Sequence, residues 1–519
     1  MSSGSDFLQL RAASAPTKGL TTWLVDAVRA AVADGRLVAG ARLPATRVLA
    51  TDLGVSRGVV VEAYQRLVDE GLAQARTGVG TVITTLLTPP APGPAGAGPA
   101  TPGPATPDPA EVAPGPAAPG SAEAVPGPGA VGGPPDRAGA STPTGFRLPL
   151  GPAAGIEFDL SPGRPDLAAF PRAAWLRAER TVLATMTSTD LGYGDPRGTL
   201  PLRTELAAWL ARTRGTRADP DDVVVVAGVA QALALVARIL GAGRAVAIED
   251  PGSRGARDQL IHWGMHLHPV PVDGDGLRID ALAATGAPIV LLTPAHQFPT
   301  GVVLAPQRRR ELLGWADAHG GLILEDDYDA EHRYDRAPVA ALQASAADRV
   351  VYMGSTSKTL APGMRLGWMV APRAMRDHLI AAKHATDLGN PALSQLVLAH
   401  LLASGEYERH LRRVRVRQRR RRDALHAALT RHLPDARVEG VAAGLHLLIS
   451  LPGDVPDTVL AEKVAEVGVR VHPLSWHRMV PGPPGLVIGY AAHPPNRLEE
   501  AARRMGAGLA AVVRSTTAR

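Results

Sequence analysis

The chain has 519 residues, 45% of them hydrophobic, and a formal net charge of +6 at pH 7. This length exceeds that of one ordinary domain, and the mildly basic charge permits a nucleic-acid partner without demanding one. The sequence contains no cysteine, which excludes disulfides, zinc–thiolate sites and thiol nucleophiles. We find neither a signal peptide nor an apolar run of about 18 residues, and we therefore expect a soluble, cytoplasmic protein.

The N-terminal unit, about residues 18–85, predicts a small α+β domain after a flexible segment of residues 1–17. Apolar residues recur at helical spacing in three stretches. The predicted helices cover residues 21–35, 45–54 and 55–71. Ser56 is the expected N-cap of the third helix, and the sequence after it alternates through a turn at Gly78 and Gly80, as the two strands of a wing do.

Residues 86–145 differ in composition from everything around them. This stretch is nearly all Pro, Ala and Gly, so it has almost no side chain to bury. Packing such a segment would bury too little apolar surface to offset the conformational entropy lost when the chain becomes ordered. We expect a disordered, semi-extended linker between the small N-terminal unit and a large one of residues 146–519.

The large unit alternates apolar strands with helical stretches, which indicates an α/β domain with a mostly parallel sheet covered on both faces. The predicted strands are residues 222–228, 245–252, 288–294, 321–327 and 349–355. Chemistry in such a sheet belongs at the carboxyl ends of the strands. The unusual residues there are Gly228, Gln231, Asp250, Thr293, Asp326, Tyr328, Ser355 and Lys358.

Lys358 is one of only four lysines, against 51 arginines. A lysine can lose its proton and act as a nucleophilic amine, which an arginine cannot do. Taken singly, a lysine is usually a solvated surface residue, and Asp326 in its acidic loop is more often a cap or ion-pair partner. Together, an amine, a carboxylate, a phenol, hydroxyls and an arginine at successive strand ends match the needs of pyridoxal 5′-phosphate (PLP).

Several segments of the large unit resemble the aminotransferase-like, fold type I domain of MocR/GabR-type regulators. They are residues 193–210, 249–257, 293–301, 325–335 and 355–368. Residues 35–72 resemble the winged helix-turn-helix of the GntR family. The resemblance covers nearly the whole chain except the linker, with both parts in the same order. It implies a smaller C-terminal α+β subdomain, a PLP cofactor, a promoter DNA partner and a homodimer.

The resemblance also implies roles for individual residues. Lys358 would form the internal aldimine with PLP, Asp326 would face the pyridine nitrogen, and Tyr328 would bind the ring oxygen. Tyr193 matches the tyrosine that reaches the phosphate from the partner subunit. The implied phosphate ligands are Ser355, Arg365 and the backbone amides of Val229 and Ala230.

Three positions depart from the family pattern. Val229 replaces a hydroxyl that is often found beside the phosphate, and Ser253 replaces an aromatic residue near the cofactor. Val487 stands where aminotransferases place an arginine that clamps the substrate carboxylate. These losses weaken the case for binding an amino acid in the usual way, and they favour PLP itself as the sensed molecule.

In a winged helix the third helix enters the major groove and the wing follows the backbone or the minor groove. The alternative for any single arginine is a solvated surface residue. As a set, the expected DNA contacts are Arg47, Ser56 and Arg57, with Arg42 and Arg76 for phosphates and Gly78 and Gly80 shaping the wing.

A second basic run, residues 409–425, has two interpretations. Its spacing suits a long structural helix with Leu411, Val414 and Leu425 inward and solvated or paired arginines outward. It could also form an auxiliary DNA surface.

Three hypotheses on function remain open. The leading one is a PLP-dependent DNA-binding transcriptional regulator that senses PLP or an amino compound through the aldimine at Lys358, with a long linker that tolerates variable half-site spacing. The alternative is a working PLP-dependent aminotransferase with an accessory DNA-binding domain. The third is a DNA-binding protein whose large domain binds no cofactor. Residual transaminase chemistry stays compatible with the first hypothesis.

Overall fold

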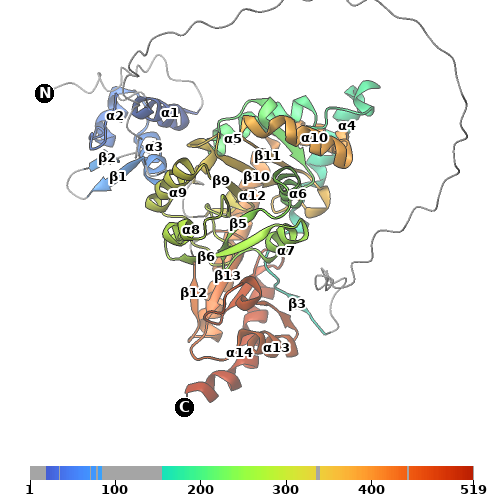
Figure 1. Cartoon of the computed structure of the whole chain (residues 1–519). Coiled ribbons are helices and arrows are strands. Elements are labelled where there is room, and N and C mark those ends of the chain that lie inside the picture. Colours follow the sequence, from blue (N-terminus) through green and yellow to red (C-terminus); the bar gives the residue numbers. More distant parts are fainter. Residues whose placement is uncertain are drawn as a thin grey trace, which may run out of the picture. The chain divides into compact units, whose positions relative to one another are not determined.

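The computed structural model describes residues 19–33, 36–70, 72–76, 80–84, 155–334, 339–440 and 443–517 (Figure 1). The predicted N-terminal segment 1–17, the linker 86–145 and Gly78 lie outside these residues. In the part of the chain that is described, no helix is both long and apolar enough to span a bilayer.

The N-terminal domain has the predicted order of three helices and a wing. The elements are α1 (Leu20–Ala33), α2 (Thr46–Asp52), α3 (Arg57–Asp69), β1 (Ala73–Arg76) and β2 (Gly80–Ile83). β1 and β2 pair antiparallel. Val60, Tyr64 and Leu67 on one face of α3 are buried with apolar residues of α1 and α2, which builds the core of this domain. The winged helix-turn-helix prediction is confirmed.

The turn between α2 and α3 begins at Gly54, whose φ of +61° lies in the left-handed region that glycine adopts without strain. Ser56 occupies the N-cap position of α3, as predicted, with extended backbone. Its side chain accepts no capping hydrogen bond. The exposed hydroxyl is thereby left for other partners.

The described part of the large domain contains an eight-stranded sheet in the order β4-β11-β10-β9-β8-β5-β6-β7. The strands are β4 (Val223–Val226), β5 (Ala245–Asp250), β6 (His266–Asp273), β7 (Gly276–Leu277), β8 (Ile289–Leu292), β9 (Leu322–Asp327), β10 (Val350–Ser355) and β11 (Gly367–Val370). Strands β6, β5, β8, β9 and β10 are parallel to one another, and β7 pairs antiparallel with β6. β11, absent from the predicted strands, lies antiparallel between β10 and β4.

Helices cover both faces of this sheet, which explains the continuous apolar strands. In β4, Val224 and Val226 pack with α6 and α7 on one face, whereas Val223 and Val225 pack with α5 and α11 on the other. The helices of this domain are α4 (Arg172–Thr185), α5 (Leu200–Arg214), α6 (Val229–Leu240), α7 (Arg254–His262), α8 (Ile279–Ala284), α9 (Pro306–His319), α10 (Arg376–Asp387) and α11 (Ala392–Ala403). The mostly parallel, doubly covered sheet confirms the predicted α/β fold.

A smaller C-terminal subdomain follows the long helix α12 (Glu406–His432). Its antiparallel sheet has the order β12-β13-β16-β15, and helices α13 and α14 pack on one face. The elements are β12 (Arg437–Glu439), β13 (His446–Ser450), α13 (Asp457–Glu466), β15 (His472–Pro473), β16 (Leu486–Gly489) and α14 (Pro495–Thr517). The short strands β3 (Phe158–Asp159) and β14 (Val469–Arg470) pair in parallel and tie the start of the large domain to this subdomain.

Helix α12 contains the arginine-rich run. Leu411, Val414 and Leu425 are buried, which confirms the structural helix with those three residues inward. Arg417 and Arg421 both pair with the buried Asp166, at 2.8 and 2.9 Å. The auxiliary DNA surface stays a prediction for the outward arginines.

Candidate functional site

Arg47 and Arg57 lie at the two helices of the helix-turn-helix. Arg47 is near the start of α2 and Arg57 is the first residue of α3, and both side chains are exposed. Within the described residues neither guanidinium has an ion pair. Because Ser56 is also exposed and precedes Arg57 directly, the amino end of α3 presents two donors to an approaching groove.

Arg42 belongs to the wing. Its backbone forms an antiparallel bridge with Val82, which makes it a third strand position beside β2. Gly80 has a φ of +105°, and a Cβ there would lie 3.3 Å from Arg42 Nε. Arg76 is the last residue of β1 and pairs with Gly80. The absence of a side chain at Gly80 leaves room for the Arg42 side chain beside the wing. Gly78 lies outside the described residues.

Lys358 lies in the turn after β10, at the carboxyl edge of the large sheet. Its Nζ donates a hydrogen bond to the carbonyl of Gly163 at 2.6 Å. Burial lowers the pKa of Lys358, although the charges of Asp329 and Asp326 oppose this shift. The result is a partly desolvated amine beside two carboxyl groups, the environment in which a lysine becomes nucleophilic.

Asp326 belongs to the neighbouring strand β9, which pairs with β10 through Asp326 and Met353, and Tyr328 directly follows the last residue of β9. Asp326 Oδ1 is buried and has no hydrogen-bond partner among the described residues. Burial, with the charges of Asp327 and Asp329, raises the pKa of Asp326 to about 7. An unsatisfied buried carboxyl oxygen fits a group that brings its own N–H, such as a pyridinium.

The amino end of α6 lies beside Arg365. Val229 and Ala230 are the first two residues of the helix, so their amides have no acceptor inside it. Arg365 Nη2 donates to the carbonyl of Ala227. The next residue in the chain, Gly228, has a φ of +93°. These amides and the guanidinium form an anion-binding arrangement of the kind that holds phosphate.

Strand β11 passes close to the amino end of α6. A Cβ on Gly367 of β11 would lie 2.9 Å from Gly228 Cα, so only glycine fits there. Ser355 is the last residue of β10, and its Oγ accepts from the Ser357 amide at 3.4 Å, a weak bond that leaves the hydroxyl available.

Three other positions do not join this cluster within the chain. Tyr193 is 92% exposed, as expected of a residue that would serve a partner subunit. Ser253 is the N-cap of α7 and accepts from the Ala256 amide at 3.3 Å. Val487 is fully buried in β16 with Leu448 and Leu474, so an apolar surface stands where the resemblance places a clamp arginine.

Some strand-end residues have structural roles instead. Asp250 accepts from the amides of Met479 and Val480 at 2.7 and 3.0 Å and holds that loop of the C-terminal subdomain. Thr293 donates to Glu249 at 2.7 Å. Burial raises the pKa of Glu249 to about 7, so this carboxyl group is partly protonated near neutral pH.

Two features were missed in the sequence. Lys383 is a second buried lysine, but its Nζ pairs with Asp387 at 2.5 Å on the same helix, so rarity of lysine alone does not identify the reactive amine. His296 also contacts Tyr328 and Asp329. In the sequence, only the motif at residues 293–301, which contains His296, could have pointed to this residue. Its partners Tyr328 and Asp329 are 32 and 33 residues away.

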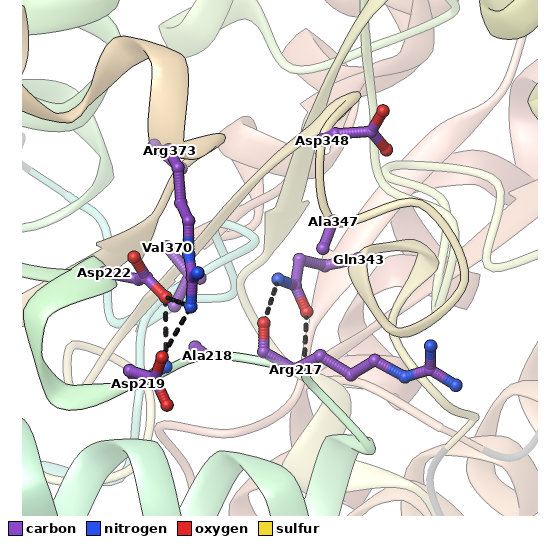
Figure 2. Close-up of a pocket in the computed structure, with 10 residues that line it drawn as sticks. Arg217, Ala218, Asp219, Asp222, Gln343, Ala347, Asp348, Val370 and Arg373 are labelled. Atoms are coloured by element: carbon purple, nitrogen blue, oxygen red, sulfur yellow. Dashed lines mark hydrogen bonds and ion pairs between the residues drawn. The ribbon is translucent and has the colours of Figure 1, made fainter.

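A pocket of about 460 Å³ lies at the opposite edge of the sheet (Figure 2). Asp222 immediately precedes β4, and Asp348 lies just before β10, so this pocket is at the amino ends of those strands. Figure 2 shows the Arg373 guanidinium reaching the carboxylates of Asp219 and Asp222. Its Nη2 lies 2.5 Å from Asp219 Oδ2 and 3.5 Å from Asp222 Oδ2. Because Arg373 is already paired with Asp219 and Asp222 in this pocket, we place the candidate cofactor site at the edge of the sheet that holds Lys358.

We expect Asp326→Asn to raise the melting temperature of the cofactor-free protein, and to raise it more at pH 8 than at pH 5. The folded-state pKa of Asp326 is raised from 3.8 to about 7. Between these values the folded protein holds a proton that the unfolded chain has released, so the cost of ionisation grows from about pH 4 to 7 and is complete above 7. Thermal unfolding at both pH values measures this, with exposed Asp317→Asn on α9 as control. An equal effect at both pH values would contradict the raised pKa.

Two family models match the chain. "Aminotransferase class I and II" matches residues 156–505, and "Bacterial regulatory proteins, gntR family" matches residues 20–83. Among solved structures, the kynurenine aminotransferase of Pyrococcus horikoshii is 25% identical with a TM-score of 0.65, covering 70% of this chain and 92% of its own. The α-aminoadipate aminotransferase LysN of Thermus thermophilus is 28% identical with a TM-score of 0.64, covering 70% and 94%.

Two curated relatives span both parts of the chain. The "Probable rhizopine catabolism regulatory protein MocR" of Rhizobium meliloti is 32% identical over 488 residues, 92% of this chain and 91% of its own. The "HTH-type pyridoxine biosynthesis transcriptional regulator PdxR" of Corynebacterium glutamicum is 32% identical over 482 residues, 91% and 92% of the two chains. The chain therefore belongs to the MocR/GabR-type regulators, in which a GntR-family winged helix-turn-helix is fused to an aminotransferase class I and II domain.

Proposed function

We propose that this protein is a PLP-dependent transcriptional regulator that binds promoter DNA and senses PLP, or an amino compound that reacts with it, at Lys358. The observation that carries the proposal is the convergence of Lys358, Asp326 and Tyr328 at the carboxyl edge of the sheet, beside the anion-binding end of α6, in a chain that also has a winged helix. As a DNA-bound regulator it would work in the cytoplasm.

Each residue of the site has a proposed task toward PLP. Lys358 would hold the cofactor covalently, the unsatisfied Asp326 carboxyl would accept from the pyridinium N–H, and the Tyr328 phenol would donate to the ring oxygen. The phosphate would be held by Ser355, Arg365 and the amides of Val229 and Ala230. Bound PLP supplies an aldehyde that reacts reversibly with primary amines.

Between the two effectors, the structure favours PLP. Val487 is enclosed by Leu448 and Leu474, so this wall offers no cation for a substrate carboxylate. A relative that is 32% identical is named for pyridoxine biosynthesis. Control of vitamin B6 genes by PLP is therefore the first target to test, ahead of an amino acid response.

The proposed working form is a homodimer. Tyr193, 92% exposed, lies near a run of exposed apolar side chains on and after α4. They are Leu176, Leu183, Leu191 and Leu200. Covering such a surface with a second copy would bury apolar area and would bring Tyr193 to the partner's site. Paired winged helices on a long linker would then read two half-sites, with tolerance for their spacing.

DNA binding to the chain's own upstream intergenic region, with and without PLP, tests the proposal. We expect PLP to change the affinity or the footprint, because an effector shifts an equilibrium only by its differential affinity for two states. Sustained turnover of an amino acid with a keto acid, with no PLP effect on DNA, would favour the aminotransferase alternative. A protein that binds DNA but no PLP would support the cofactor-free alternative.

A further inference from the structure

The phenol of Tyr328 is backed by a buried histidine–aspartate pair that none of the proposed cofactor roles uses. His296 Nδ1 lies 2.9 Å from Asp329 Oδ2 and 3.1 Å from the Tyr328 hydroxyl. His296 and Asp329 are 3% and 2% exposed, whereas Tyr328 is partly exposed. The pair therefore lies behind the phenol, on the side away from solvent.

Both members of the pair contact the phenol and fix its position. Burial alone would raise the pKa of Asp329, but the charge and hydrogen bond of His296 lower it below its ordinary value, so the carboxylate can only accept. His296 must then carry its proton on Nδ1 to donate to Asp329. The Tyr328 oxygen faces the same N–H and can accept from it, while the phenolic O–H is hydrogen-bonded to the Asp329 carboxylate, so a cofactor ring oxygen would share or take over this proton. Burial, with the charge of Asp329, also raises the pKa of Tyr328, so its proton is retained.

Gly444 of the C-terminal subdomain closes the other side of the pair. Its φ is +75°, and a Cβ there would lie 2.6 Å from His296 Nδ1 and 2.9 Å from Asp329 Oδ2. Its carbonyl accepts from the hydroxyls of Tyr334 and Tyr490, each at 2.5 Å. The backbone at Gly444 is thus fixed directly against the imidazole, and the subdomain is in contact with the group that orients Tyr328.

We infer that His296 and Asp329 are positioning residues that hold the Tyr328 phenol where it would meet the cofactor ring oxygen, and that Gly444 couples the C-terminal subdomain to this positioning. The inference rests on the proposed function, because the position of this phenol matters only if PLP is bound. It gives the C-terminal subdomain a physical route to the sensing site: a shift at Gly444 would move the imidazole and, with it, the phenol.

A PLP titration of the full-length protein, followed by visible absorption, tests the pair. We expect Tyr328→Phe, His296→Asn and Asp329→Asn each to weaken PLP binding by about three- to tenfold, the range of one net hydrogen bond. In a Tyr328→Phe background, His296→Asn should add less than about twofold, because the pair acts through the phenol. Additive losses, or single variants that bind like the wild type, overturn the inference while leaving the proposed function intact. Failure of the wild type to bind PLP overturns the proposed function itself.

A spectroscopic readout separates positioning from a merely structural role. A donor to the ring oxygen stabilises its anionic form, so loss of the donor should move the pH midpoint of the bound PLP absorption to higher pH in His296→Asn. An unchanged midpoint in that variant would contradict the inference even if affinity fell.

The glycine provides a second test if the pair variants fold poorly. Gly444→Ala should weaken PLP binding several-fold, since its Cβ would collide with the imidazole. Gly286→Ala is the matched control, because its φ of +63° imposes similar backbone strain with nothing within 4 Å of the new Cβ. If both variants bind PLP equally, Gly444 has no role at the pair.

Discussion

Lys358→Ala is expected to abolish covalent PLP binding and any response of DNA binding to PLP. The amine is the only group in the cluster that can bond to the cofactor aldehyde, and its partial desolvation keeps a fraction neutral and nucleophilic. The measurements are the visible absorption band after PLP addition and the mass increase after borohydride reduction. Both should be lost completely, since no neighbouring side chain can replace an amine.

Lys463→Ala is the matched control for this variant. Lys463 lies on α13, is 43% exposed and pairs with Glu466 at 2.8 Å, so its loss should leave the absorption band and the reduced mass unchanged. Retention of the mass increase in Lys358→Ala would show that PLP attaches at another lysine, Lys383 being the next candidate. Loss of the band in both variants would point to general unfolding, which thermal denaturation would reveal.

The double variant Arg47→Ala/Arg57→Ala should lower promoter affinity by about 30-fold or more, since each groove contact of this kind is worth about 1–3 kcal/mol. Both guanidinium groups are exposed on the helix-turn-helix and have no ion pair among the described residues, so they are available to DNA. Fluorescence anisotropy at several salt concentrations measures the loss.

Arg66→Ala on the same helix α3 is the control for charge. Its guanidinium already pairs with Glu62 at 2.7 Å, and it lies two turns beyond Arg57 toward the C-terminal end of the helix. We expect less than a threefold change in promoter affinity. An effect of Arg66→Ala as large as that of the double variant would mean that general positive charge, rather than the face of Arg47 and Arg57, binds the promoter.

Local pattern was sufficient for much of the architecture. The apolar runs predicted five strands of the large sheet, because a strand buried on both faces must be apolar at every position. The same reasoning omitted β6 and β7 at one edge of the sheet, and β11, which enters the sheet antiparallel between β10 and β4. The antiparallel pairing of β11 requires the chain to reverse direction after Lys358. The pattern of residues 367–370 does not indicate that reversal.

The residues of the site also divide into those that the sequence could predict and features that depend on the folded structure. Lys358, Asp326, Tyr328 and Arg365 could be proposed from the sequence because parallel strands bring their carboxyl ends to one edge, so strand-end residues are neighbours by topology. The hydroxyl of Ser56 could be placed at an N-cap position, but its lack of a capping bond depends on a side-chain rotamer that the sequence does not specify.

By itself, therefore, the sequence determined the domain order and the family, and it singled out Lys358 as the proposed reactive amine, since these depend on composition and on motifs contiguous in the chain. Only the tertiary structure decided how the groups at the site are oriented. Gly444 meets His296 because two subdomains pack together, and residues 148 positions apart carry no local signal of their contact. Burial likewise sets the raised pKa of Asp326, because desolvation is a property of the packed fold and not of the residue.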